Sequence, residues 1–245
     1  EGTGMFAKSS SLMENYGTIN IAASTSADKP NVGMFTEDED TPIYNHKDIL
    51  GGNNTYAIYG KNVKMTGGKI SVGENSVGIY SNGEYAILGT DGVDLASGSE
   101  IEVGENESVG VFTTGKNQNI SSKATMKIGD GSYGFVIKGT GTKLTAESPD
   151  VTVGNNTVFA YSTDTTGNII NKTKLTSTGS KNYGIYGAGA ISNLADINFA
   201  SGTGNVGIYS IGGGTATNGD PMLKPTITVS GSDIENKSYG IGMAA

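Results

Sequence analysis

Short segments in which apolar and polar residues alternate recur along the whole chain. The clearest is 70–80, ISVGENSVGIY, in which two alternating runs flank a Gly-Glu-Asn turn. Related segments lie at 101–112, 126–136 and 151–161. The second half of the pattern returns alone at 31–35, 55–59, 182–186, 205–209 and 238–242. This period-two alternation is rich in β-branched residues and bounded by Gly, Asn and Ser, and it therefore predicts short strands joined by turns.

The spacing of the repeats predicts how the strands are arranged. Their central residues lie 21 to 33 positions apart, and self-similarity at such a period is typical of a solenoid. About 24 residues hold three strands of about 4 to 5 residues with their turns, which describes one rung of a parallel β-helix. We predict an all-β fold, a single continuous β-helix over residues 1–245 with about ten rungs and a length of about 48 Å. The central residues are Gly4, Gly33, Ala57, Gly78, Gly110, Gly134, Phe159, Gly184, Gly207 and Gly240.

Two segments break the period and are predicted to be protruding loops, 36–50 and 210–225. The second contains several glycines and two prolines, which suit a surface loop. The first contains the only histidine, His46, and a run of acidic residues. A solvated loop, a calcium site and a partner contact are all open interpretations of this run, although its spacing matches no calcium-loop motif. The candidate binding residues here are Glu37, Asp38, Glu39, Asp40 and Tyr44.

Between Gly78 and Gly110 the interval is also long, which predicts an enlarged coil there. The segment 84–88, EYAIL, resembles a degenerate copy of the repeated motif inside that coil. The pairs Asn82-Gly83 and Asp91-Gly92 mark its turns.

The five-residue motif Ser-Val-Gly-Ile-Tyr at 76–80 suggests which side chains face inward. Strict alternation places the second and fourth positions on one face, interpreted as the core, and the third and fifth on the other. The third-position glycine indicates either a bend with positive φ or close backbone approach. The fifth position forms a predicted aromatic ladder, which either packs in the core or at a corner, the favoured interpretation, or presents rings for binding. The aromatic ladder consists of Phe6, Phe35, Tyr59, Tyr80, Phe112, Tyr161, Tyr186 and Tyr209.

Composition and charge restrict the function classes. The chain has 39 glycines, no cysteine, no arginine and a net charge of −8. Disorder is the alternative for such a polar chain, but the regular placement of Ile, Val and Tyr favours a fold. Nucleic-acid binding needs Arg and Lys clusters that are absent, and the negative charge disfavours an anionic membrane surface. No apolar run is long enough to insert in a membrane, and no cofactor or metal site is predicted.

An enzyme is a second function class, because β-helices also carry polysaccharide-degrading sites. Such sites need paired carboxylates or a proton-accepting base beside a cation. Examples of such pairs are Glu100 with Glu102 and Asp91 with Asp94, and they are interpreted as exposed strand and turn residues. The acids Glu74, Glu105 and Asp130 recur in the turns, either as an acidic stripe or simply as turn residues.

The recurring S-V-G-I-Y and N-Y-G-I-Y units and I-x-V-G-E-N turns, in an acidic chain without cysteine, resemble the passenger domains of bacterial type V autotransporters. They are most similar to the large fusobacterial outer-membrane adhesins. This resemblance implies a right-handed β-helix displayed at the cell surface on the outer membrane, which attaches to host cells or other bacteria through a protein or glycan receptor. A passive stalk is the alternative. The chain starts without Met, so we interpret it as a slice of a longer protein whose open rungs self-associate end to end.

Overall fold

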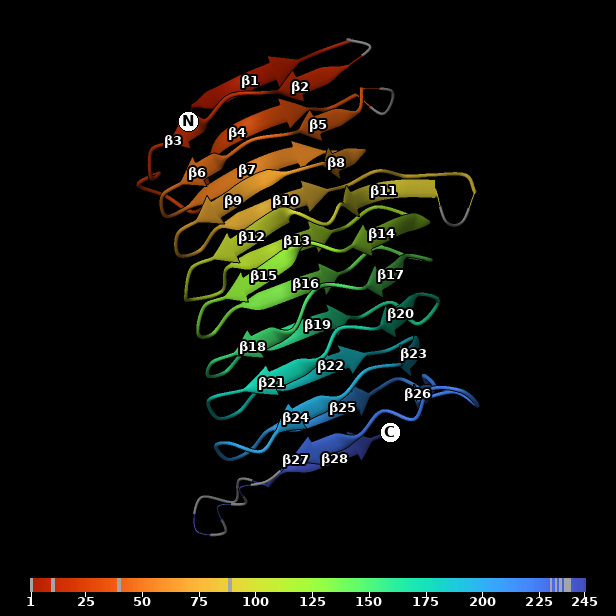
Figure 1. The fold of residues 1–245 in the computed structure, drawn as a ribbon. Helices are drawn as coiled ribbons and strands as arrows, with labels where there is room; N and C mark the ends of the chain where they lie inside the picture. The colour runs from red at the N-terminus through yellow and green to blue at the C-terminus, as the bar shows by residue number, and fades with distance from the viewer. Residues whose placement is uncertain are drawn as a thin grey trace.

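The computed structural model describes residues 2–9, 12–38, 41–87, 90–229, 231, 233, 235 and 239–245, with only the backbone described at 90 and 91. In these ranges the chain forms 28 strands and no helix. The strands are arranged in three parallel sheets, called A, B and C, of ten, nine and nine strands. Each turn of the chain passes through A, then B, then C, and Figure 1 shows the resulting stack from β1 to β28.

Sheet A contains the repeated motif and crosses the middle of the view in Figure 1. Its strands are β1 (Thr3–Ala7), β4 (Asn31–Thr36), β7 (Thr55–Gly60), β10 (Val77–Ser81), β13 (Val109–Thr113), β16 (Tyr133–Ile137), β19 (Val158–Ser162), β22 (Tyr183–Gly187), β25 (Val206–Ser210) and β28 (Ile241–Ala244).

Sheets B and C complete each rung with shorter strands. Sheet B contains β2 (Met13–Asn15), β5 (Ile43–Asn45), β8 (Val63–Met65), β11 (Thr90–Leu95), β14 (Gln118–Ser122), β17 (Lys143–Ala146), β20 (Asn168–Asn171), β23 (Ala190–Asn193) and β26 (Ala216–Asn218). Sheet C contains β3 (Ile19–Ile21), β6 (Ile49–Gly51), β9 (Gly68–Val72), β12 (Ser99–Val103), β15 (Thr125–Ile128), β18 (Val151–Val153), β21 (Leu175–Ser177), β24 (Ile197–Phe199) and β27 (Ile227–Val229).

The register stacks equivalent residues above one another. Ile79 pairs with Ile58 of the preceding rung and with Val111 of the next. All strand pairs are parallel, and at about 4.8 Å per strand ten rungs form a rod about 48 Å long. The prediction of one parallel β-helix of about ten rungs is therefore confirmed.

The sheet A strands do not follow strict alternation. In β10, Val77 and Tyr80 are partly exposed, whereas Gly78, Ile79 and Ser81 are buried. Two consecutive inward positions require a kink at the glycine. A Cβ atom on Gly78 would lie 2.6 Å from the carbonyl oxygen of Gly110 in the next rung. Close backbone approach therefore explains this glycine, and positive φ does not.

Small and medium apolar side chains fill the narrow interior. Ile58, Ile79 and Val111 form one inward row of sheet A, and each is fully buried. The two largest side chains in this part of the core, Phe135 and Phe159, meet edge to face with ring centroids 5.5 Å apart. The core is a continuous seam because each rung buries its inner face against its neighbours.

Buried polar side chains continue the stacking at two corners. Before the sheet A strands, the Ser76 amide donates to Ser108 Oγ, and the Ser108 amide donates to Ser132 Oγ, at 3.3 and 3.1 Å. Between sheets B and C, Asn15 Nδ2 donates to Asn45 Oδ1 at 2.8 Å, and an equivalent Asn row closes the other end of the stack. Buried polar atoms need such partners, so these rows specify the register of successive rungs.

The predicted loop 36–50 is wrong. It contains β5 and the first two residues of β6, and the side chains of Ile43 and Ile49 are fully buried. The strands of this rung were not predicted because β5 and β6 have only three residues each, which is too short for a recognisable alternation. Glu39 and Asp40 lie outside the described residues.

The predicted loop 210–225 is partly wrong, since β26 lies inside it and pairs with β23. The exposed portion follows β26, where the Met222 side chain is 91% exposed. A further insertion precedes β11, where Ile87 is 74% exposed. Thus the enlarged coil exists, but 84–88 is not a sheet A strand: Glu84 forms an isolated bridge with Lys116, and residue 88 is outside the described ranges.

The last rung is shifted by two residues from its predicted alignment. Val206 pairs with Ile241 and Ile208 with Met243, so the position equivalent to Gly207 is Gly242. The motif-like Tyr-Gly-Ile at 239–241 suggested Gly240 instead.

Candidate binding surface

The aromatic ladder lies on the outside of sheet A. Tyr59, Tyr80 and Tyr186 are partly exposed at the fifth motif position, between buried residues on either side. The Tyr80 hydroxyl lies 3.0 Å from the exposed Thr114 hydroxyl. The core interpretation of the ladder is therefore wrong. The kink at the glycine turns the second position outward and leaves the fifth outward, whereas the prediction assumed that a kink would turn the rings inward.

Successive rings of the ladder pack on one another. The centroids of Tyr59 and Tyr80 are 4.7 Å apart with an interplanar angle of 14°. Tyr161 and Tyr209 stack on Tyr186 from either side, at 5.3 and 5.2 Å. The ring faces are thus largely covered by neighbouring rings, and the surface presents ring edges and hydroxyl groups.

A second outward row runs beside the ladder, although the second motif position was expected to face the core. It consists of Val and Tyr side chains, of which Val109 and Val206 are nearly covered, at 8% and 4% exposed, and the Tyr56 ring stacks on Tyr80 with centroids 5.8 Å apart. We call the two rows together the sheet A face. The second row contains Val32, Tyr56, Val77, Val109, Tyr133, Val158, Tyr183 and Val206.

Partial burial changes the acidity of two phenols on this face. Desolvation raises the pKa of Tyr59 above its ordinary value, with smaller contributions from Tyr80 and from the Glu37 carboxylate. Desolvation also raises the pKa of Tyr56. A phenol is protonated at neutral pH even at its ordinary pKa, so both side chains present O–H groups that donate or accept hydrogen bonds.

Two cavities open on the sheet A face. One, of about 310 Å³, is lined near the first rungs by Pro30, Phe35 and Tyr59 among others. The other, of about 340 Å³, lies around Val136 in the middle of the stack. Both have aromatic and aliphatic walls, which are the usual lining of ligand sites.

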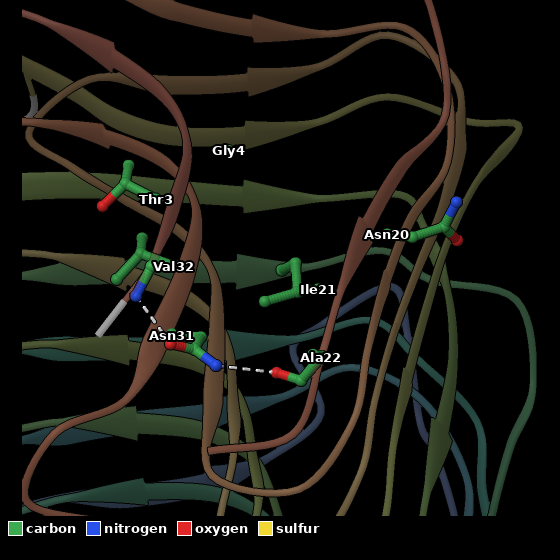
Figure 2. A pocket seen from close by; sticks show the side chains of 8 residues that line it. Thr3, Gly4, Asn20, Ile21, Ala22, Asn31 and Val32 are labelled. Carbon is green, nitrogen blue, oxygen red and sulfur yellow. Dashed lines mark hydrogen bonds between the residues drawn. The ribbon is translucent and has the colours of Figure 1, made fainter.

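A third cavity, of about 240 Å³, lies at the corner of sheets C and A in the first two rungs. Figure 2 shows Thr3, Val32 and Ile21 around it, with Asn20 pointing away. The side-chain Nδ2 of Asn31 donates to the Ala22 carbonyl at 3.0 Å, so this polar group is already engaged within the turn. The lining offers backbone and small side chains without a convergent set of reactive groups.

The two described acids of the predicted acidic run have different neighbours. Glu37 lies beside Tyr59, whereas the Asp38 carboxylate accepts a hydrogen bond from the Ser9 amide. Within the described ranges, no group of three or more His, Asp or Glu side chains is placed to hold a metal ion. Tyr44 lies on sheet B, with the Lys64 ammonium 5.8 Å from its ring centroid.

A polar cluster at the ends of the first three sheet B strands was not predicted from the sequence. The His46 ring stacks on Tyr16 with centroids 4.4 Å apart, and its Nε2 lies 3.5 Å from Glu14 Oε1. Its Nδ1 lies 2.5 Å from the Thr66 hydroxyl. These residues come from three rungs at unequal sequence spacing, so only the fold reveals that they meet.

The carboxylate pair Glu100 and Glu102 lies on the outside of sheet C between two lysines. Lys127 Nζ is 2.8 Å from Glu100 Oε1, and Lys69 contacts Glu102. The hydrogen bond from Lys127 is the main cause that lowers the pKa of Glu100. Both acids belong to an ion-paired surface row, which supports the structural interpretation of this pair. Asp94 is exposed on β11, and the Asp91 side chain lies outside the described set.

The turn acid Asp130 bonds to the next rung. Its two carboxylate oxygens accept from the amide and the side chain of Asn155, both at 2.9 Å, and these bonds lower its pKa. This favours a turn role for Asp130.

No helix in the described ranges has the length and apolarity to span a bilayer. Comparison of the chain with protein-family models, with curated proteins and with solved structures gives no match.

Proposed function

We propose that this chain is a segment of a cell-surface adhesin that attaches to host cells or other bacteria through a protein or glycan receptor. The observation that supports the proposal best is the sheet A face, where apolar and aromatic side chains remain outside the core over successive rungs. Extended exposed patches of this kind mark interaction surfaces.

The chemistry of this face suits recognition better than catalysis. Tyr side chains contribute large contact area at low conformational cost and donate or accept hydrogen bonds at their hydroxyls. Charged groups such as Glu37 and Lys138 border the rings and supply a polar rim. Apolar centres with polar rims are typical of protein-binding surfaces.

The proposal is tested by measuring attachment of the fluorescently labelled chain to epithelial, immune and bacterial cells. Tyr186→Lys places a charge on the sheet A face, whereas Asn198→Lys places the same charge on the exposed side of sheet C. We expect saturable attachment that Tyr186→Lys weakens at least about tenfold, because a hot-spot aromatic contributes about 2 kcal/mol or more. Asn198→Lys should bind like the original chain.

Unfolding curves of both variants must match before attachment is compared. Attachment that both variants lose equally would refute a role for the sheet A face. Absence of saturable attachment to every cell type would refute the adhesin proposal and favour a stalk.

A further inference from the structure

The aromatic ladder is interrupted in its middle. Val136 occupies the fifth motif position of β16, and its Cα partners in the adjacent rungs are Phe112 and Tyr161. The rung that carries Val136 therefore lacks the ring that would separate its two neighbours. Because Val is much shorter than Tyr, the ladder has a gap there.

The gap coincides with the cavity of about 340 Å³. Val136 and Val109 line it as nearly buried aliphatic residues, 5% and 8% exposed, and Phe112 and Tyr161 border it from the flanking rungs. The ring of Tyr133 also lines it and meets Tyr161 at an interplanar angle of 65°, with centroids 6.2 Å apart.

The size of the gap matches one flat ring. Phe112 and Tyr161 are two rungs apart, which corresponds to about 9.6 Å along the stack. Elsewhere in the ladder, adjacent ring centroids are 4.7 to 5.5 Å apart. An inserted ring halfway between Phe112 and Tyr161 would therefore take the ladder's own spacing.

The charged residues at the cavity, Lys138 and Glu107, favour an aromatic ring that carries a hydrogen-bond donor, such as a phenol or an indole. The exposed Lys138 ammonium lies over the Phe112 ring, 5.5 Å from its centroid, so it must move aside from this face when a ring enters and can then lie against the inserted ring. A cation near the face of an aromatic ring attracts it. Glu107, also exposed and lining the cavity, offers an acceptor for a phenol O–H or an indole N–H.

We propose that this gap binds a tyrosine or tryptophan side chain presented by a protein partner. A sugar ring of similar size is disfavoured because Val109, Val136 and Phe112 offer no side-chain hydrogen-bond partners, so only hydroxyls that point to the rim at Glu107 and Lys138 would be paired. Buried hydroxyls left unpaired there would be costly. The biological use of the site rests on the proposed attachment function, whereas its ability to take an aromatic ring does not.

The ring specificity is tested on the chain with ¹³C-labelled valine methyl groups. N-acetyltryptophanamide and N-acetyltyrosinamide are titrated, with methyl β-galactoside as the sugar arm. We expect saturable ring-current shifts of the Val136 methyls with the aromatic amides, no comparable shift with the galactoside, and unchanged methyls at Val77 on the unbroken part of the face. Equal shifts at Val77, stronger saturation by the sugar, or no saturation at Val136 would each overturn the proposal.

Two variants test the mechanism of binding. Val136→Tyr supplies the missing ring and should weaken binding of the aromatic amides at least about tenfold, because it occupies the space they need. Lys138→Gln, at an exposed position that keeps the fold, should weaken it about threefold through loss of the cation. Unchanged binding in folded Val136→Tyr, or in Lys138→Gln, would contradict the assignment.

The outcomes separate the two proposals. If the aromatic amides bind at Val136 but the chain attaches to no cell, the site stands and the adhesin function fails. If the chain attaches to cells, Val136→Tyr attaches equally well and the amides do not bind, the function stands and the site fails.

Discussion

Replacing Asn182 tests whether buried polar rows hold the rungs together. Asn182 is fully buried at the first motif position, before β22. Its Oδ1 accepts from the Thr157 amide at 2.9 Å, and its Nδ2 donates to the Gly154 carbonyl at 2.6 Å and to Ser177 Oγ at 2.9 Å. Asn182→Ala removes all three bonds. The Thr157 N–H and the Gly154 carbonyl of the preceding rung then lose the side chain that they bond to.

The expected cost follows from counting these bonds. Each buried hydrogen bond contributes about 1 kcal/mol net, so Asn182→Ala should lower the free energy of unfolding by about 3 kcal/mol. Asn182→Ser is the matched control, because Ser108 fills the equivalent place. The Ser108 hydroxyl accepts from the Ser76 amide and donates to the Gly73 carbonyl. Serine at 182 should thus keep two of the three bonds, and the loss should be about 1 kcal/mol.

Hydrogen exchange of the Thr157 amide measures the effect at the bond itself, and urea unfolding measures it globally. A cost of about 3 kcal/mol corresponds to exchange faster by about two orders of magnitude. We expect Ala to accelerate exchange at Thr157 more than Ser does. Equal effects of Ala and Ser, or an unchanged Thr157 exchange rate in Ala, would refute the idea that the side-chain row carries the stability.

Three further predictions concern turns and corners. Gly139→Ala should lower the free energy of unfolding, measured by heat or urea, by about 1 to 3 kcal/mol, because the added Cβ would overlap the carbonyl oxygen of Gly115 in the preceding rung. Gly17→Ala is the control, since its Cβ would meet nothing within 4 Å, and it should change the free energy of unfolding by no more than about 0.5 kcal/mol. Lys181→Gly should stabilise by about 0.5 kcal/mol, since φ is 60° there and the relief of strain exceeds the entropy cost of glycine; a loss of stability would contradict this. The folded-state pKa of the Asp130 carboxyl should lie below its ordinary value, because Asn155 donates hydrogen bonds to the ionised form. Its contribution to stability is therefore present above the ordinary pKa and is lost as the pH falls through the lower folded-state pKa. A titration midpoint at or above 3.8, measured by carbon-detected NMR, would refute this prediction.

The rung architecture could be predicted because its determinants are local and repeated. The Val-Gly-Ile-Tyr units at β10 and β25 place the same residue types at the same register in distant rungs. Strands such as β5 could not be predicted, because three residues give too little alternation and their burial depends on the preceding and following rungs. Acidic neighbours such as Glu37 mark the turn before β5 but do not exclude a strand after it.

The orientation of the ladder illustrates a limit of alternation rules. Period two gave the correct inward side for Ile79 and the wrong side for Val77, because Gly78 and Ile79 both face inward. A one-residue irregularity reverses the face of every residue before it. Gly78 indicated that the alternation could break at this point. The sequence alone did not show whether the residues before the glycine or those after it would keep the predicted face. The cluster at His46 and Tyr16 depends on contacts between rungs, so no local pattern encodes it.

The buried rows also explain how an exposed gap can keep a defined shape. Val136 lies on β16, whose first residue, Tyr133, donates its amide to the Ser108 carbonyl at 2.8 Å, while the Ser108 amide donates to Ser132 Oγ. These bonds fix the position of β16 against β13, and the Val158 amide, which donates to the Ser132 carbonyl at 3.1 Å, fixes β19 against β16. Together they set the separation of Phe112 from Tyr161. A site whose walls are held by the core needs little ordering when a ring enters, so less of the contact energy is lost on binding. The interior that gives the rod its stability is therefore what makes the gap in the ladder a preformed site.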